Sequence, residues 1–496
     1  MAIENKQIEK KTQDPKLLTQ PEQGTAATRT ENDLLGTREV PADAYYGIQT
    51  LRAIENYNIS KTTLKDYPNF VRGIAVTKLG AAKANYKLGV ITEEQFEAVK
   101  YACEQIIGGK YHDQFVVDMI QGGAGTSTNM NANEVIANIA LEKMRHKKGE
   151  YKYCRPHDVV NASQSTNDAY PTFIHVGLYY THLELREHLI DLIESLRNKA
   201  DEFENILKMG RTQLQDAVPM TLGQSFGGFA YILENELTHL DHAAEDFLTI
   251  NMGATAIGTG ICSKPGYAAR AVKAIREVTG FQFKLADHLV GATSDTSCMA
   301  NYSSAMRLVA EKLNKVCNDL RTLSSGPRCG LNEINLPAMA PGSSIMPGKV
   351  NPVIPEVCNQ VAYKVIGNDL CVAMCNQAAQ MELNAMEPVM AQCCFASANL
   401  LMNGMDTLRT RCIDGITANA ERCLEYVHNS IGIVTALDPV IGYVNATKIA
   451  KEALATGKGV YELVIEQKLL TKEQLDIILK PENMIEPVAL DIRIAH

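Results

Sequence analysis

Residues 178–207 read LYYTHLELREHLIDLIESLRNKADEFENIL, and this stretch decides the class of fold. Its large apolar residues are separated by steps of three, four and their sums. This spacing places them on one face of a helix, which suits packing against nearly parallel helices. The stretch therefore predicts one long helix of a bundle. The residues of the apolar face are Leu178, Leu185, Leu189, Leu192, Leu196, Phe203 and Leu207.

Two more stretches, 226–247 and 302–323, repeat this spacing, and residues 353–385 and 390–415 are predicted as further helices. Gly326-Pro327 follows the stretch 302–323 and ends that predicted helix. Helices of roughly 25–35 residues exceed the ordinary mean of ~11–12 residues, and at 1.5 Å per residue the bundle is ~40 Å long or more. Because that length outgrows one small core, we expect the bundle to continue across copies in a homo-oligomer. A monomeric rod is the alternative, which the glycine-dense loops between the helices disfavour.

The sequence on either side of these long helices is predicted to form separate parts of the molecule. The polar N-terminal stretch is predicted to be disordered, with order beginning near Asp33. Shorter helices such as 69–87 and 93–107 follow. A chain of 496 residues is long enough for roughly two to four domains. The predicted divisions are a disordered polar extension at 1–31, an N-terminal domain at 32–163, a central helical bundle at 164–418 and a small C-terminal domain at 419–496.

Composition narrows the class of protein. The net charge of −9 argues against a nucleic-acid surface. The 13 cysteines form no zinc-like pairs of CxxC motifs, so we interpret them as reduced thiols in a reducing compartment. The first residues lack a hydrophobic signal core, and no apolar run approaches ~20 residues. We therefore expect a cytoplasmic protein without a membrane span.

Four loop-like segments are rich in glycine residues and in hydroxyl and amide side chains, and three of them precede a predicted long helix. Helix N-termini offer free N–H donors and a positive dipole end, and hydroxyl and amide groups add neutral donors. Together they could surround a small polyanion with little formal charge. Ordinary capping and turn motifs are the alternative for any one segment taken alone. The segments are 121–131 (QGGAGTSTNMN), 164–168 (QSTND), 210–216 (GRTQLQD) and 342–352 (GSSIMPGKVNP).

The segment at 342–352 is the most informative. Gly342 and Gly348 could act as hinges, so the loop could open and close over a ligand. Lys349 supplies its only positive charge, and Ser343 or Ser344 could be a nucleophile or a base. A mobile surface loop with a solvated lysine is the alternative, and composition alone does not separate the two.

The same loop resembles the signature loop of the fumarase/aspartase superfamily. The other three segments resemble further blocks of that superfamily in the same order, and the similarity extends from about residue 32 onward. Within the superfamily the chain is most similar to the aspartases, although Gln213 stands where fumarases and some aspartases carry histidine. The stretches that carry this closer similarity are 122–126, 210–220, 330–337 and 351–356.

The resemblance implies a mostly α, three-domain subunit with a long central helix bundle. It also implies a homotetramer with a twenty-helix core and active sites shared by three subunits. The implied activity is that of an aspartate ammonia-lyase, a carbon–nitrogen lyase that reversibly converts L-aspartate to fumarate and ammonia. The Cβ proton is removed first, through an enediolate (aci-carboxylate) intermediate. Fumarase-type hydration of fumarate to malate is the alternative. No cofactor and no catalytic metal are implied as required, and activation by a divalent cation is left open.

Residue roles follow from the same resemblance. Ser343 matches the serine that removes the Cβ proton. The residues that match substrate-binding groups are Thr126, Ser165, Thr166 and Ser344 at the β-carboxylate, Thr212, Lys349 and Asn351 at the α-carboxylate, and Asn167, Thr126 and Gln213 near the amino nitrogen.

The chemistry is consistent with these roles. An amine departs as neutral ammonia, whereas a departing hydroxyl needs a general acid, which Gln213 cannot be. This difference favours amine loss over water loss. His157 is a candidate helper of the base, with capping or solvent exposure as the alternative, and His239 and His242 lack a third metal ligand. Residues 253–260 (GATAIGTG) look like a dinucleotide loop, but no strand is predicted before them, so a turn at the bundle end is expected.

Overall fold

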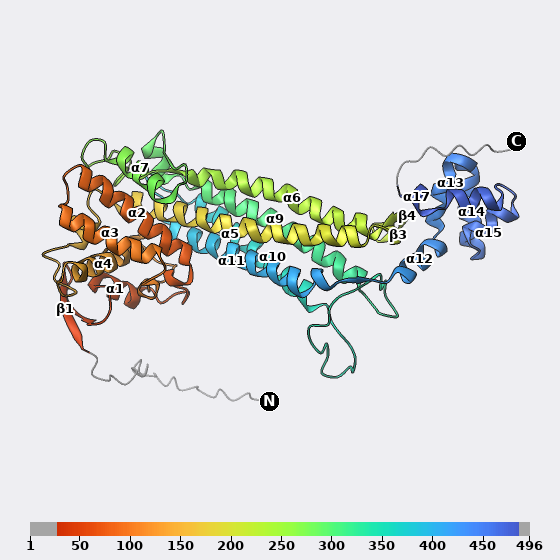
Figure 1. Cartoon of the computed structure of the whole chain (residues 1–496), viewed down its shortest axis with the longest axis horizontal. Coiled ribbons are helices and arrows are strands. Elements are labelled where there is room, and N and C mark those ends of the chain that lie inside the picture. Colours follow the sequence, from red (N-terminus) through yellow and green to blue (C-terminus); the bar gives the residue numbers. More distant parts are fainter. Residues whose placement is uncertain (1–26, 486–496) are drawn as a thin grey trace, which may run out of the picture.

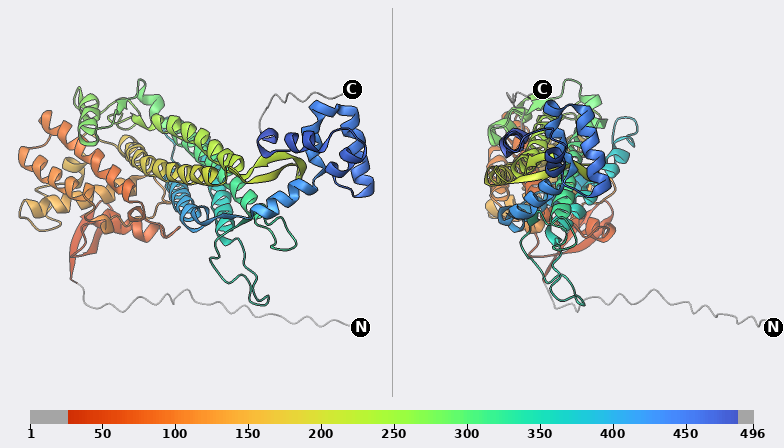
Figure 2. Two further views of the ribbon diagram at one scale, coloured as in Figure 1. Left: turned by 45° about the vertical axis from the view of Figure 1, so that its right-hand side comes forward. Right: turned by 90° about the vertical axis from the view of Figure 1, so that its right-hand side faces the viewer.

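A computed structural model of the chain describes residues 27–485 and shows an elongated, mostly helical molecule, as predicted. A cluster of shorter helices lies at one end, a bundle of long helices forms the middle, and a small helical unit lies at the other end (Figures 1 and 2). Residues 1–26 of the predicted extension and 486–496 of the predicted C-terminal domain lie outside the described residues. The domain boundaries stay a prediction.

The bundle confirms the helical periodicity. The longest helix, α5, packs against α6 and α11, and α10 packs against α9 and α11. The leucines of α5 at 185, 189, 192 and 196 are fully buried. The capping box between Ser165 and Asp168 starts α5, because each side chain bonds the other residue's backbone N–H. The bundle helices are α5 (Thr166–Glu202), α6 (Leu222–Glu245), α9 (Ser297–Leu323), α10 (Val353–Asn376) and α11 (Glu387–Arg411).

The predicted ends of α5 and α10 are wrong. Helix α5 ends at Glu202, and Leu207 belongs to a strand, because the apolar spacing continues into a hairpin that pairs Leu207 with Thr221. Helix α10 ends at Asn376 instead of 385. Its end is fixed by Asn384, whose Nδ2 donates to the carbonyl oxygen of Cys375 and to Thr296 Oγ1. Such a tertiary cap is not visible in local periodicity.

Shorter elements surround the start of α5. Helix α2 packs against α5, α3 and α7 and carries many of the buried residues of this end. The predicted stretches 69–87 and 93–107 are confirmed as α2 and α3. The elements here are β1 (Thr28–Asp33), β2 (Gly36–Pro41), α1 (Ile48–Asn56), η1 (Leu64–Asp66), α2 (Pro68–Lys87), α3 (Glu93–Ile107), η2 (His112–Gln114), α4 (Thr126–Lys143), η3 (Pro156–Val160), η4 (Asp246–Leu248), β5 (Thr249–Ile250), α7 (Tyr267–Thr279), β6 (Lys284–Leu285) and α8 (Leu289–Ser294).

Strand β1 corrects the predicted start of order. Residues 28–31, assigned to the disordered extension, pair antiparallel with β2. The pairing is held by polar contacts that composition does not reveal: Arg29 Nη1 donates to the carbonyl oxygens of Pro41 and Ala44, and Glu31 Oε2 accepts the N–H of Ile48.

The far end of the bundle joins a small helical unit with its own apolar core. The antiparallel hairpin of β3 and β4 links the two, since Asp216 accepts a hydrogen bond from Ser430 Oγ. The elements here are β3 (Leu207–Thr212), β4 (Gln215–Thr221), β7 (Ile334–Asn335), η5 (Ile413–Gly415), β8 (Thr417–Ala418), α12 (Ala420–Asn429), η6 (Ile431–Ile433), α13 (Val434–Ile441), α14 (Tyr443–Thr456), α15 (Val460–Glu466), α16 (Lys472–Ile478) and α17 (Pro481–Met484). In the part of the chain that is described, no helix has both the length and the apolar character needed to cross a membrane.

Candidate active site

The first polar segment forms the start of α4, and one glycine makes this possible. Gly125 precedes the helix with a φ of +86°, and a Cβ there would lie 2.2 Å from the ring of Tyr170 on α5. Only glycine combines that backbone angle with so close an approach. Thr126, the first residue of α4, is therefore held beside α5, with its hydroxyl exposed and donating to the carbonyl of Gly123 at 2.8 Å.

The second segment forms the start of α5, where buried Asp168 holds the backbone. Its Oδ1 accepts the N–H of Ser165 at 2.9 Å, and its Oδ2 accepts those of Gly253 at 2.8 Å and Thr255 at 3.1 Å. Burial raises the pKa of Asp168 to about 6, although these N–H groups oppose the rise. The carboxylate thus fixes the helix start against the 253–260 segment, which forms turns and short loops as predicted.

The first two segments are joined to each other. Asn129 on α4 donates through Nδ2 to Thr166 Oγ1 at 3.1 Å. Asn167 donates through Nδ2 to the carbonyl of Ala256 at 2.8 Å. Thr126, Ser165, Thr166 and Asn167, four of the predicted site residues, therefore lie on two helix N-termini that are cross-linked by side-chain hydrogen bonds.

Sequence reasoning missed one residue of this cluster. Lys78 on α2 is fully buried, and its Nζ donates to Asn129 Oδ1 at 2.7 Å, Gln164 Oε1 at 2.9 Å and Asn161 Oδ1 at 3.0 Å. A signal was available, because this lysine interrupts the otherwise apolar and small-residue stretch 74–82 (IAVTKLGAA).

The third segment is a hairpin rather than a helix start. Gln213 and Leu214 form its two-residue turn with φ values of 53° and 62°, and Thr212 pairs with Gln215. The hairpin is anchored by the buried carboxylate of Glu333, which lies 2.5 Å from Arg211 Nη1 and 3.1 Å from Lys208 Nζ. Thr212 and Gln213 are exposed at its tip.

The fourth segment is a long loop that projects from the side of the bundle between β7 and α10 (Figure 1). Ser343 Oγ accepts the N–H groups of Ile345 at 3.2 Å and Met346 at 3.0 Å. Asn351 Nδ2 donates to the carbonyl of Gly342 at 2.6 Å and closes the base of the loop. Ser344 and Lys349 are exposed.

One chain does not bring the four segments together. The starts of α4 and α5 lie at the end of the molecule that carries α1–α3, whereas the β3–β4 hairpin lies beside the unit of α12–α17 (Figures 1 and 2). The 342–352 loop leaves the half of the bundle nearer that unit, in Figure 1 and in the left-hand view of Figure 2. The predicted residues are therefore divided into the helix-start group, the hairpin pair Thr212 and Gln213, and the loop group Ser343, Ser344, Lys349 and Asn351.

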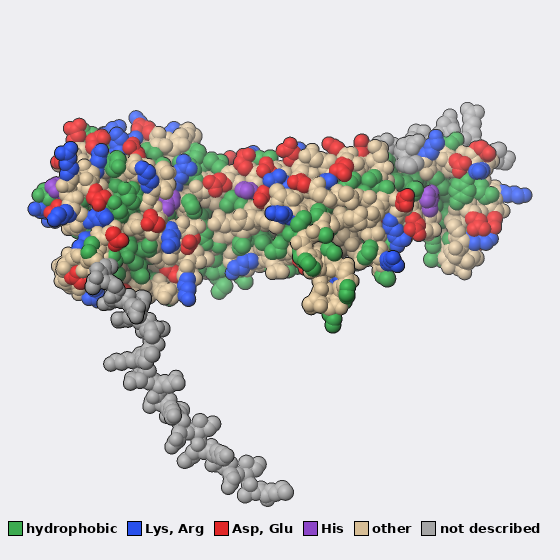
Figure 3. Space-filling view, turned by 60° about the horizontal axis from the view of Figure 1, so that its bottom comes forward, with side chains coloured by type: hydrophobic (Ala, Val, Ile, Leu, Met, Phe, Trp, Pro, Cys, Tyr) green, Lys and Arg blue, Asp and Glu red, His purple; other side chains and the backbone are tan. Residues whose placement is uncertain are grey.

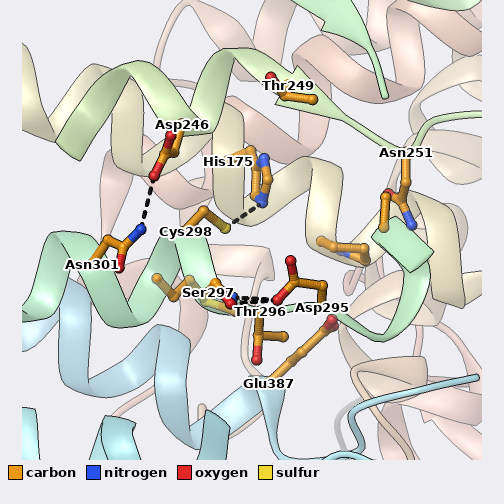
Figure 4. Close-up of a pocket in the computed structure, with 13 residues that line it drawn as sticks. His175, Asp246, Thr249, Asn251, Asp295, Thr296, Ser297, Cys298, Asn301 and Glu387 are labelled. Carbon is orange, nitrogen blue, oxygen red and sulfur yellow. Dashed lines mark hydrogen bonds between the residues drawn. The ribbon is translucent and has the colours of Figure 1, made fainter. Parts of the chain in front are cut away.

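A separate cavity of about 290 Å³ lies among α5, α9 and α11, and none of the predicted site residues lines it (Figure 4). His175 Nε2 lies 3.1 Å from Cys298 Sγ in its wall. Burial lowers the pKa of His175 to about 4 and raises that of Glu387 to about 8, so burial disfavours the charged form of both side chains. The cavity adjoins the second segment through Asn251, whose Nδ2 donates to the carbonyl of Asn167.

Two of the histidines considered from the sequence contact side chains that suit no metal site. His239 pairs only with Glu236 on its own helix, and His157 lies 2.9 Å from Gln49 Nε2. Within residues 27–485, no group of three or more His, Cys, Asp and Glu side chains is arranged to hold a metal ion. All 13 cysteines are free thiols.

Comparisons with known proteins agree with the resemblance. Residues 36–367 match a family model described as lyase, and residues 433–486 match the fumarase C C-terminus. The chain is 57% identical to an aspartate ammonia-lyase of Pseudomonas aeruginosa over 469 residues, 94% of this chain and 99% of that protein. It is 54% identical to the aspartate ammonia-lyase of Escherichia coli K12 over 460 residues, 92% and 96% of the two chains.

Two solved structures share the fold. A fumarate lyase:delta crystallin from Brucella melitensis bound to cobalt superposes with a TM-score of 0.90 at 49% identity, covering 93% of this chain and 100% of that one. A class II fumarase from Schistosoma mansoni superposes with a TM-score of 0.87 at 33% identity, covering 92% and 99%.

Proposed function

Because the chain belongs to the fumarase/aspartase superfamily of lyases, we propose that it is a carbon–nitrogen lyase that interconverts L-aspartate with fumarate and ammonia. The single observation that carries this proposal is the presence of all four polar segments in a chain 54–57% identical to aspartate ammonia-lyases over most of its length.

The active site is proposed to form between copies of the chain. The separation of the helix-start group, the hairpin and the loop supports this, because no one copy holds them together. Exposed apolar side chains on the bundle also support it: Tyr363, Leu370 and Met374 on α10 are 57–64% exposed, and Tyr231 on α6 is 63% exposed. They are spaced along the helices, and hydrophobic side chains are visible on the bundle in Figure 3. A homotetramer whose sites are shared by three subunits would bury these faces.

The first half of the site would hold the β-carboxylate. Removal of the Cβ proton places a second negative charge on this carboxylate, so donors must be aimed at its oxygens before the reaction begins. Thr126, Ser165 and Thr166 supply hydroxyls at two helix N-termini, and Ser344 of the loop would add a fourth. Fixed donors in a site closed to water act more strongly than the same groups in solution.

The loop would supply the base. A serine hydroxyl is too weak a base unless its alkoxide is stabilised. Two backbone N–H groups already point at Ser343 Oγ, at 3.2 and 3.0 Å, and hydrogen bonds to a charged form favour that form. Closure of the loop would bring Lys349 and Asn351, together with Thr212 of the hairpin, to the α-carboxylate. Asn167 and Gln213 would then lie near the amino nitrogen.

Ammonia loss needs no added acid, so the proposed reaction requires no cofactor. The similar Brucella melitensis structure is bound to cobalt, and a divalent cation acting on this chain would be an activator of the rate. Assays with EDTA, and then with added Mg²⁺ or Co²⁺, measure that contribution. We place the reaction in the cytoplasm, because a reducing compartment preserves 13 free thiols.

The proposal is tested by following fumarate absorbance and ammonia release from L-aspartate, with L-malate as the competing substrate. We expect fumarate and ammonia in equal amounts and no turnover of malate. Malate turnover without ammonia release from aspartate would establish fumarase-type hydration instead.

The base is tested by Ser343→Ala, with Ser324→Ala as the matched control, since Ser324 Oγ donates only to a backbone carbonyl at the end of α9. Ser343→Ala should abolish turnover and leave the oligomer unchanged by light scattering, whereas the control should be fully active. Full activity of Ser343→Ala would contradict proton removal by this serine.

A further inference from the structure

We propose that Lys78 is a positioning residue of the active site: its buried ammonium orients the Asn129 amide so that the Thr166 hydroxyl is free to donate to a substrate carboxylate. This inference rests on the proposed function and adds a residue that lies behind the substrate-binding groups.

Lys78 connects the two helix starts through one atom. Its Nζ donates to Asn129 on α4 at 2.7 Å, and to Asn161 and Gln164, which lie just before α5, at 3.0 and 2.9 Å. All three acceptors are neutral amide oxygens. An ammonium has three protons and no lone pair, so three acceptors satisfy it completely, whereas a neutral amine would turn a lone pair toward one of these oxygens.

The position is costly for a lysine. The side chain is fully buried, its neighbours Thr77 and Leu79 are buried as well, and no carboxylate bonds to it. Burial lowers its pKa to about 7, and the field of Asp168 on α5 opposes that shift. The thiol of Cys103 on α3 is the other titratable neighbour, and the ring of Phe173 on α5 lies 5.5 Å from Nζ. Packing alone would be served better by methionine or leucine.

The orientation of Asn129 follows from this ammonium. Its Oδ1 accepts from Lys78, so its Nδ2 must point the other way, where it donates to Asn161 Oδ1 at 3.0 Å and Thr166 Oγ1 at 3.1 Å. A flipped amide would place its NH₂ group against the ammonium. Because Thr166 Oγ1 accepts from Asn129, its own proton remains available to a ligand at the start of α5.

Two effects on the reaction follow. A hydroxyl that is already oriented loses no energy in turning toward the carboxylate as negative charge develops. The ammonium also places a positive charge behind that hydroxyl, in a region that water does not reach. Both effects increase as the carboxylate becomes the dianion, so they act on kcat more than on KM.

A double-mutant cycle separates positioning from simple structural support. Lys78→Met keeps an unbranched side chain, one atom shorter, and removes its charge. We expect kcat for L-aspartate to fall about 10²-fold, as for the loss of one pre-oriented donor. In the Thr166→Val background the same change should cost only a few-fold, because Lys78 acts through the hydroxyl that is already absent. Lys83→Met on the same helix is the matched control. Lys83 is partly exposed, and its Nζ is as far as 4.0 Å from the Glu277 carboxylate, so this ion pair is weak. It should leave kcat unchanged.

A second variant tests the orientation without removing the lysine. Asn129→Asp retains the size of the side chain and a partner for Lys78, but its other carboxylate oxygen would accept the Thr166 proton instead of donating to Thr166. We expect a folded oligomer, by circular dichroism and light scattering, with strongly reduced kcat. This variant decides the question if Lys78→Met does not fold.

Equal losses from Lys78→Met in both backgrounds, or full kcat in Asn129→Asp, would overturn the inference. Failure of the unmodified chain to release ammonia from L-aspartate would instead overturn the proposed function, so the two failures are distinguishable.

Discussion

Two inactive variants of this chain should restore each other's activity when they assemble together. Thr166→Val removes a hydroxyl at the start of α5, and Ser343→Ala removes the proposed base from the loop. In one chain the start of α5 lies at the end of the molecule that carries α1–α3, whereas the 342–352 loop leaves the half of the bundle nearer α12–α17 (Figures 1 and 2). A site would then draw Thr166 from one copy and Ser343 from another, and a mixed oligomer could contain a site with neither defect.

The size of the recovery follows from random assembly. A site is intact when the copy that supplies Thr166 carries only Ser343→Ala and the copy that supplies Ser343 carries only Thr166→Val. In an equal mixture each condition holds for one copy in two, so about one quarter of the sites should be intact. If each parent retains ~1% of the activity or less, the hybrid should exceed either parent by ~25-fold or more.

The assay uses co-expression with two different affinity tags, purification through both, and measurement of kcat per chain. A mixture of Ser343→Ala with Lys349→Ala is the matched control, because both residues lie in the same loop and one copy supplies both. Because Lys349→Ala keeps part of its kcat, that mixture should show no more than the average kcat of its two parents. A doubly tagged hybrid of the first pair with no more activity than its parents would refute assembly of the site from separate copies.

Three further outcomes are expected. Lys349→Ala should raise KM for L-aspartate more than it lowers kcat, because the residue would bind the α-carboxylate in substrate and transition state alike; an unchanged KM would contradict that role. Gly125→Ala should lower the free energy of unfolding by ~2 kcal/mol or more, because the new Cβ would lie 2.2 Å from the ring of Tyr170. Gly457→Ala is the control, since Gly457 has a similar φ but open space around it, and it should lower the free energy of unfolding by ~1 kcal/mol. Equal losses of Tm in the two variants would refute the clash. Burial raises the pKa of Glu387 from 4.5 to about 8, so between these pH values the folded chain keeps a proton that the unfolded chain releases, and stability falls as pH rises. Glu387→Gln should flatten this fall, measured as Tm against pH. An unchanged slope would contradict the burial of a protonated Glu387.

The helices were largely predictable because they depend on local spacing. The buried face of α5 follows from its apolar steps, and α2 and α3 begin and end within a residue of the predicted ranges. The ends of α5 and α10 were not predictable, because a hairpin partner and the Asn384 side chain fix them from elsewhere in the chain. Strand β1 was missed because charged side chains, rather than apolar ones, secure it.

The four polar segments were recognisable from the sequence, but their separation in one copy was not. Glycine residues and hydroxyl and amide side chains are typical of loops and helix starts anywhere in a fold. The order of the segments along the chain does not tell which of them meet within one copy. Lys78 was missed for a related reason. Its partners Asn129 and Asn161 lie 51 and 83 residues away along the chain, and only the fold places them at one atom.

The two lysines of the proposed site differ in a way that bears on the order of events. Lys78 is buried and fully hydrogen-bonded, so the half of the site built on α4 and α5 is formed before substrate arrives. Lys349 is exposed on a loop that holds few contacts beyond its base. With a net charge of −9, the chain as a whole does not attract a dicarboxylate, so local donors must capture it. Capture by the rigid half would come first, and closure of the loop would then deliver Lys349 and Ser343 together. Under this proposal, binding and proton removal would be coupled to one movement, because the base would reach Cβ only when the second carboxylate had been neutralised.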